Sequence, residues 1–357
     1  MYLGLGLYKN MLTRENYKFA RQCGCTHIVA HLANYYVNDI VPTTDETQNY
    51  GRTDGDDECW SYEYLKTLRE EIESEGLCLH AIENFSPAHW YDVLLDGPKK
   101  QEQMAHLKQI IENVGRAGIP VFGYNFSIAG VWGHTQLPKA RGGASTACFD
   151  HPDGGGDFPI PAGEVWNMTY ADHLGGDTIP PTSPEALWGR VQWFLDELLP
   201  VAERANVKLA AHPDDPPMPF IRGHARLVYQ PSLYQKLADL HPSPSNCFDF
   251  CMGSVQEMSE GNVYEVIEQY APQDKLAYIH FRNVHGKVPC YQETFVDNGD
   301  IDMLYALKLL KDCGYTGVLI PDHTPQMTCA APWHSGMAYA LGFIRAALRA
   351  IQAEEDN

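Results

Sequence analysis

The feature that most limits the possible folds of this chain is a repeated alternation of short apolar runs with amphipathic helical patterns. Each run has the length of one buried strand. Strands that alternate with helices predict a parallel sheet, because each crossover helix returns the chain to the start of the next strand. Eight such pairs without a strong break predict an α/β fold, a single (β/α)8 TIM-barrel domain over residues 1–357.

The predicted elements follow one another along the whole chain. The strands are 3–7, 26–30, 77–82, 119–124, 207–211, 246–251, 276–281 and 317–321. The helices are 13–23, 61–74, 99–117, 183–205, 231–240, 263–270, 300–312 and 334–350. Thr13 has the side-chain oxygen expected at a helix N-cap, and Gly76 follows the second helix where a left-handed residue is expected.

The longest interruption of this alternation is the insertion 127–185, after the fourth strand. It is rich in glycine and proline and also contains aromatic residues, namely Trp132, Phe149, Trp166 and Tyr170. Loops of this length inside a compact domain are usually functional or disordered, and the aromatic residues favour a packed structure. We therefore expect an inserted active-site loop or lid.

Composition excludes several classes of partner. The formal net charge of −20 argues against a nucleic-acid backbone or an anionic membrane surface. No apolar run approaches the roughly 20 residues that span a bilayer, and the first residues lack the pattern of a signal peptide. The 10 cysteines are scattered without paired spacing, which is typical of reduced thiols in a cytoplasmic protein.

Four successive predicted strands end on side chains that bind metals, namely His212, Cys251, His280 and Asp322. The C-terminal ends of barrel strands face one shared mouth, so we expect these residues to lie together. Two imidazoles, a thiolate and a carboxylate suit a borderline divalent ion such as Mn²⁺, Fe²⁺, Co²⁺ or Zn²⁺, whereas Mg²⁺ and Ca²⁺ favour oxygen ligands.

Each of these residues also has an ordinary structural interpretation. A lone histidine at a strand end more often donates to a backbone carbonyl, and a lone cysteine is more often a small buried hydrophobe. Asp322 can cap the turn before Pro325, and Cys247 competes with Cys251 because it lies on the same strand face. We prefer Cys251 because it ends the strand, and because independent packing rarely arranges four ligand types at successive strand ends.

Further polar residues follow the predicted strands. His323 comes directly after Asp322, and an imidazole suits proton transfer near neutral pH. Arg282 and Asn283 follow His280, and a guanidinium matches a substrate carboxylate, although an internal salt bridge is an equally good interpretation.

Glu83 and Asn125 occupy the corresponding places after the third and fourth strands, and we expect both at the barrel mouth. Asp214 and Asp215 follow His212 and can either fix its imidazole by hydrogen bonds or form the proline-rich turn. The chain has no GxSxG or Walker A motif, and no GxGxxG in a suitable context.

With these segments in view, the chain resembles the mannonate dehydratase family, which belongs to the xylose-isomerase-like barrels. The matching segments are His212-Pro213-Asp214-Asp215-Pro216-Pro217, Phe250-Cys251-x-Gly253-Ser254, His280-Phe281-Arg282-Asn283, Gly299-Asp300-Ile301-Asp302-Met303, Asp322-His323, and Tyr124-Asn125-Phe126 with Glu83 upstream. They are spread over most of the chain, in the order that the family has.

The resemblance implies a reaction and a set of site residues. The reaction is loss of water from D-mannonate to give 2-keto-3-deoxy-D-gluconate, at a Mn²⁺ ion held by His212, Cys251, His280 and Asp322. His323 is implied in acid–base work, and Arg282 meets the substrate. We expect Asn125, Asn283, Glu83 and Trp132 near the sugar acid. The resemblance is also compatible with a homo-oligomer.

Two segments depart from the family pattern. Val131-Trp132-Gly133-His134-Thr135 stands where the family has a Trp-Thr-Arg stretch, and Met337-Ala338-Tyr339 stands where it has a Tyr-Asp-Arg run. Substrate-facing arginines and a catalytic tyrosine of the family are therefore replaced. A metal-dependent isomerase or epimerase of the same barrel superfamily is the alternative function, and a non-catalytic sugar-binding protein is a third.

Overall fold

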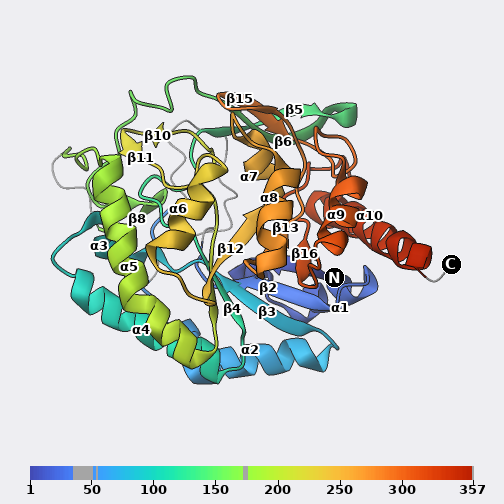
Figure 1. Cartoon of the computed structure of the whole chain (residues 1–357), viewed down its shortest axis with the longest axis horizontal. Coiled ribbons are helices and arrows are strands. Elements are labelled where there is room, and N and C mark those ends of the chain that lie inside the picture. The colour runs from blue at the N-terminus through green and yellow to red at the C-terminus, as the bar shows by residue number, and fades with distance from the viewer. Residues whose placement is uncertain (35–50, 54, 172–175, 356–357) are drawn as a thin grey trace.

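Eight parallel strands close into a barrel in the computed structural model, which describes residues 1–34, 51–53, 55–171 and 176–355 (Figure 1). Around the barrel the strands follow the order β1-β16-β13-β12-β9-β4-β3-β2. The strands are β1 (Tyr2–Leu7), β2 (His27–His31), β3 (Cys78–Glu83), β4 (Val121–Tyr124), β9 (Lys208–Ala211), β12 (Asn246–Cys251), β13 (Leu276–His280) and β16 (Val318–Ile320). The prediction of an eight-stranded α/β barrel is confirmed.

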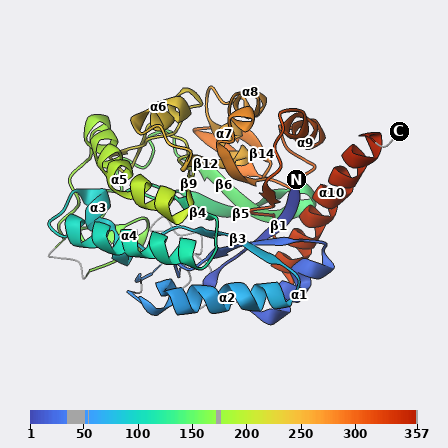
Figure 2. The same ribbon diagram turned by 60° about the horizontal axis from the view of Figure 1, so that its bottom comes forward.

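The helices pack outside the strands, with α2 and α4 side by side along one edge of the molecule (Figure 2). The predicted helices correspond to α1 (Arg14–Gln22), α2 (Tyr62–Ser74), α4 (Lys100–Arg116), α5 (Pro184–Ala205), α6 (Ser232–Leu240), α8 (Val263–Tyr270), α9 (Met303–Asp312) and α10 (Pro332–Glu355). Thr13 caps α1 by accepting a hydrogen bond from the Asn16 amide, and Gly76 adopts a φ of 74° after α2, as expected. None of the helices in the described residues is long and apolar enough to span a membrane.

The interior of the barrel holds a small buried cluster separate from the main core. It contains mostly small and β-branched residues, with Cys247 and Tyr278 among them. The larger core fills the layer between the strands and the surrounding helices. Cys247 is therefore a packing residue within the barrel.

A four-stranded antiparallel sheet lies beyond the barrel strands, at the top of Figure 1. The insertion contributes β5 (His134–Ala140) and β6 (Ala144–Asp150), and the segment after β13 contributes β14 (Val284–Lys287) and β15 (Cys290–Glu293). Strand β6 pairs with β15, for example through Tyr291 and Phe149. The β5–β6 part of the insertion thus packs against a segment distant in the sequence, while residues 172–175 lie outside the described residues.

The register of the barrel strands decides which side chains meet at their C-terminal ends. Cys251 is level with His280 on the neighbouring strand, and His31 is level with Glu83. Because these pairs end parallel strands, their side chains project toward the same mouth.

Candidate metal centre

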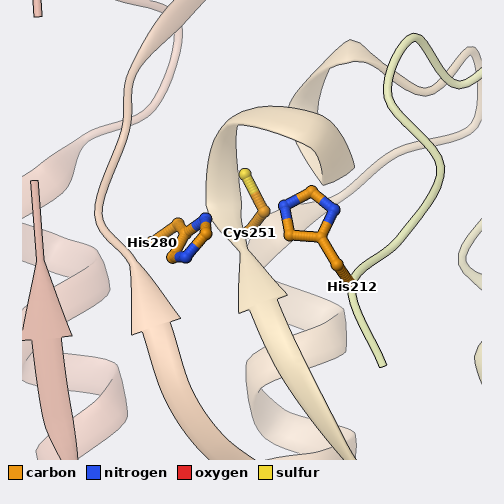
Figure 3. Close-up of side chains that lie close together, drawn as sticks. All are labelled: His212, Cys251 and His280. Carbon is orange, nitrogen blue, oxygen red and sulfur yellow. The ribbon is translucent and has the colours of Figure 1, made fainter. Parts of the chain in front are cut away.

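The structure brings His212, Cys251 and His280 together at the ends of three neighbouring strands. One potential ligand atom from each residue lies within 4.8 Å of the other two. Figure 3 shows the Cys251 sulfur between the two imidazole rings. Cys247, the competing cysteine, instead directs its thiol toward the carbonyl oxygens of Pro244 and Asp274, at 3.3 and 3.8 Å. The geometry therefore selects Cys251.

The surroundings of Cys251 favour its thiolate form. Its sulfur caps the short helix α7 (Met252–Glu257) by accepting a hydrogen bond from the Ser254 amide at 3.4 Å. Burial alone would raise the pKa of this thiol, but the Arg282 guanidinium and the two imidazoles lower it to about 5. The sulfur is thus prepared as a metal ligand at neutral pH.

Both histidines are oriented by groups that do not belong to the ligand set. His212 Nδ1 lies 2.6 Å from the carbonyl oxygen of Pro213, which leaves Nε2 available. His280 donates from Nε2 to Glu83 Oε2 at 3.3 Å, and Asp249 Oδ1 is 3.4 Å from the same nitrogen. Such contacts fix the ring and the tautomer of a metal-binding histidine.

Asp249 is a site residue that the sequence analysis missed. It lies two residues before Cys251, so both side chains point to the same strand face, and this spacing was the signal available in the sequence. Burial and the neighbouring Glu83 raise the pKa of Asp249 to about 7, although the imidazoles oppose this shift. Among the described residues, neither of its carboxylate oxygens makes a hydrogen bond, although His280 lies within ion-pair distance.

Asp322, the fourth predicted ligand, follows β16 and lies beside the three-residue group, outside the set of atoms that are all within 4.8 Å of one another. Its Oδ1 is 3.6 Å from His280 Nδ1, and its Oδ2 is 3.5 Å from Arg282 Nε. The residue adopts a φ of 63°, in the left-handed region that a non-glycine residue rarely occupies. Strain of this kind persists where the surrounding structure enforces it, often at functional sites.

The residues present fit a divalent cation. The buried Nδ1 of His280 has no hydrogen bond in the described part of the chain, and it faces the side where Asp322 lies. A thiolate, two imidazoles and a carboxylate form the donor set that the sequence predicted, and borderline metals prefer it.

Arg282 is the centre of a buried ion-pair network, and only 2% of it is exposed. Its guanidinium donates to Asp215 Oδ2 at 2.6 Å and also to Glu293, while Glu257 Oε1 lies at 3.2 Å. Burial raises the pKa of Glu257 well above its usual range, with the Asp215 charge adding to this effect. The guanidinium thus balances the Asp215 and Glu293 carboxylates next to the Cys251 sulfur.

Replacing Arg282 with methionine is expected to destabilise the fold strongly. The change leaves the buried Asp215 and Glu293 carboxylates without their cation, and breaking a buried pair in this way costs about 3–5 kcal/mol. Denaturant unfolding measures the loss. The matched control is Arg141→Met, because Arg141 forms an exposed pair with Asp297 and should change the unfolding free energy by less than about 1 kcal/mol. Equal effects of the two changes would contradict a structural role for the Arg282 network.

His323 lies beside the cluster, with 42% of its side chain exposed. Its Nδ1 is 2.9 Å from Glu293 Oε1, and its Nε2 is 3.5 Å from Asp322 Oδ1. Although partial burial lowers the pKa of the imidazole, Asp322 and Glu293 raise it to about 9. Glu293 therefore holds Nδ1, and Nε2 faces the side of the cluster on which Asp322 lies.

The four predicted substrate contacts lie in different surroundings. Asn125 accepts from Trp166 Nε1 and donates to the Pro213 carbonyl, both at 3.4 Å. The Glu83 carboxylate is buried and lies 3.3 Å from His280 Nε2. Trp132 is fully buried within the insertion, next to Phe158.

The side-chain amide of Asn283 forms all its hydrogen bonds within the protein. The carbonyl oxygen accepts from the amides of Val284 and Ile301, and the NH₂ group donates to the carbonyls of Val296 and Ile301. An asparagine side chain has two donors and two acceptor positions, so no capacity is left for a substrate.

The two aspartates after His212 do not fix its ring by hydrogen bonds. Asp214 binds Arg226 at 2.7 Å and accepts from the amides of Leu227 and Val228. Asp215 accepts from Arg282 and from the hydroxyl of Tyr291 at 2.9 Å. The interpretation that they hold His212 was wrong, because the adjacent Pro213 carbonyl performs this role.

Comparison with known proteins matches nearly the whole chain to one family. A family model described as D-mannonate dehydratase (UxuA) matches residues 18–169 and 177–355. Mannonate dehydratase of Streptococcus equi subsp. zooepidemicus is 32% identical over 279 residues, covering 74% of this chain and 75% of that protein. Mannonate dehydratase of Thermotoga maritima is 30% identical over 285 residues, covering 74% and 78%.

Solved structures agree with this match. The crystal structure of mannonate dehydratase from Streptococcus suis serotype 2 has a TM-score of 0.76 and 25% sequence identity, covering 100% of this chain and 95% of that chain. An L-ribulose 3-epimerase structure has a TM-score of 0.55 and 13% identity, covering 99% and 97%. The second similarity concerns the barrel fold alone.

Proposed function

The chain belongs to the D-mannonate dehydratase family, and from this premise we propose that it removes water from D-mannonate to give 2-keto-3-deoxy-D-gluconate. It is a hydro-lyase by family membership. One observation supports the proposal most directly. The His212–Cys251–His280 cluster lies next to Asp322 and His323 at the mouth of the barrel. Binding and acid–base groups thereby share one site.

The family implies a divalent metal, and we assign its binding to His212, Cys251, His280 and Asp322. We propose Mn²⁺ as the native ion, with Fe²⁺, Co²⁺ and Zn²⁺ as the other ions that this donor set accepts. When bound, the ion offsets the negative charge that develops on the substrate carboxylate as the C2–H bond breaks. Asp249 and Glu83 hold His280 in the orientation that binding requires.

His323 is the residue to which we assign the proton transfers. The neutral imidazole, which a pKa of about 9 makes the minor form at neutral pH, takes the proton from C2 at Nε2 and returns it to the departing C3 hydroxyl, which leaves as water. The enol that results becomes the 2-keto acid when its hydroxyl proton moves to C3. Glu293 orients the ring through Nδ1 throughout, because its carboxylate accepts the hydrogen bond there.

The substrate lies, in our proposal, between this imidazole and the insertion 127–185, which acts as a lid. Asn125 remains a direct contact to the sugar acid, because its two hydrogen bonds are long and leave capacity on its amide. The other three predicted contacts, Trp132, Asn283 and Glu83, have a supporting role, because other groups of the protein surround their side chains or form hydrogen bonds with them. We expect the protein to act in the cytoplasm, where its ten free cysteines stay reduced.

A direct assay tests the proposed reaction. Protein stripped with a chelator and reloaded with Mn²⁺ is expected to convert D-mannonate into a 2-keto-3-deoxy acid, and the stripped protein is expected to be inactive. A colour test for the keto-deoxy product and proton NMR together measure conversion. Failure to dehydrate D-mannonate or any of a panel of aldonates would overturn the proposal, and interconversion of aldoses and ketoses without water loss would favour the isomerase alternative.

A further inference from the structure

A second cluster of metal-binding side chains lies away from the barrel mouth. It consists of Asp57, His89 and His106, and one ligand atom from each lies within 4.8 Å of the others. Asp57 directly precedes the turn η2 (Glu58–Trp60), His89 ends the turn η3 (Pro87–His89), and His106 lies in helix α4. None of the three belongs to the proposed catalytic site. The cluster therefore joins three separate segments of the outer layer.

The Nε2 atoms of the two imidazoles both point toward one carboxylate oxygen of Asp57. His89 Nε2 is 2.9 Å and His106 Nε2 is 3.4 Å from Asp57 Oδ1. A tetrahedral ion with ligands at about 2.0–2.1 Å holds its ligand atoms roughly 3.3 Å apart. The two measured separations lie on either side of that value, so an ion requires only small side-chain movements.

The protein holds the histidines in place before any ion arrives. His89 is buried, with 7% exposed, and its ring meets the buried Trp60 edge-on with 6.1 Å between centroids. Asn113 of α4 donates to the carbonyl oxygen of Trp60 at 3.0 Å, which fixes α4 against η2. Asp57 is the exposed member of the cluster, with 71% of its side chain accessible to solvent. One open side thus remains for an ion to enter.

A simple ion pair explains this arrangement less well than a metal does. One carboxylate needs only one imidazolium for charge balance, and a second protonated ring with its centroid 4.7 Å from the first would repel it. Two neutral imidazoles can instead both offer lone pairs to a cation that the carboxylate neutralises in part. The Lys9 ammonium pairs with the neighbouring carboxylate, Asp56, at 3.1 Å.

We propose that Asp57, His89 and His106 form a second metal site for a borderline divalent ion of the Zn²⁺ class. Water fills the remaining coordination position, because the protein supplies three ligands and Zn²⁺ in proteins is usually four-coordinate. The bound ion fastens the segment before α2 to α4. Its role is structural, and it is distinct from that of the catalytic ion.

Zinc stoichiometry tests the proposal. After dialysis against micromolar Zn²⁺, the whole protein is expected to retain two ions per chain by elemental analysis, and His106→Gln and Asp57→Asn are expected to retain one. The matched control is His241→Gln, because His241 pairs with Asp196 at 2.8 Å but is absent from the metal-binding groups of the described residues. This control should retain two ions.

Cobalt spectroscopy distinguishes metal binding at the barrel-mouth site from metal binding at the second site. With Co²⁺ as the probe, the thiolate charge-transfer absorption reports the Cys251 site and should be unchanged in both variants. The proposal is overturned if the parent protein binds one ion, or if His106→Gln and Asp57→Asn both bind as many ions as the control. Asp57 is largely exposed, so the Asn variant tests the site even where His106→Gln folds poorly.

Discussion

Replacing Cys251 with serine is expected to remove the catalytic metal and, with it, nearly all dehydratase activity. The thiolate is the central member of the cluster, between His212 and His280. Losing a group that merely supports a ligand weakens metal binding by about 10–100-fold, so losing the ligand itself should exceed about 100-fold. Competition with a chromogenic chelator measures the affinity for Mn²⁺.

The control for this experiment is Cys247→Ser, on the same strand. Both cysteines are fully buried, but the Cys247 thiol donates to the Pro244 carbonyl oxygen and lies within the inner barrel cluster. Its replacement should leave the metal affinity within a factor of a few. Unchanged Mn²⁺ affinity in Cys251→Ser would remove this residue from the ligand set.

Replacing His323 with asparagine is expected to lower kcat by about 10²–10⁴-fold, the usual contribution of a general acid or base. Asparagine keeps a polar group near Glu293 and Asp322 but cannot exchange a proton. KM and the bound Mn²⁺ should change little, because His323 is not among the proposed ligands. Steady-state kinetics with D-mannonate and elemental analysis make the comparison.

A matched variant is His285→Asn, because His285 of β14 pairs with Asp300 at 2.8 Å and has 40% of its side chain exposed. It should retain the kcat of the parent protein. If His323→Asn loses its bound metal along with its activity, the imidazole supports the ion and the proton transfers belong to another group. A kcat within a factor of a few of the parent would exclude His323 from the chemistry altogether.

The barrel itself was predictable because its signals are local. Each strand is a short apolar run, and caps such as Thr13 and Gly76 mark where helices begin and end. The metal-binding residue types were predictable once the strands were assigned, because strand ends in a barrel meet at one mouth. His212, Cys251 and His280 therefore required only the order of the strands.

Features that depend on distant partners could not be predicted. Strand β6 pairs with its sequence neighbour β5 and also with the distant β15, and no pattern near Ala144–Asp150 indicates the second partner. The residue type of Arg282 suits a substrate carboxylate and an internal ion pair equally well, and only the structure shows the carboxylates from four other segments that surround it. Asn283 is likewise committed to the loop that it anchors.

The pairing of β6 with β15 also sets the order in which the protein can mature on the ribosome. Strand β6 leaves the ribosome long before Cys290–Glu293 is synthesised, so the four-stranded sheet is incomplete until late in translation. Asp322 follows later still, and β1 closes the barrel only by pairing with β16. A nascent chain therefore lacks both the closed barrel and the fourth proposed ligand until its last strand is made, and we expect stable metal binding only at the end of synthesis.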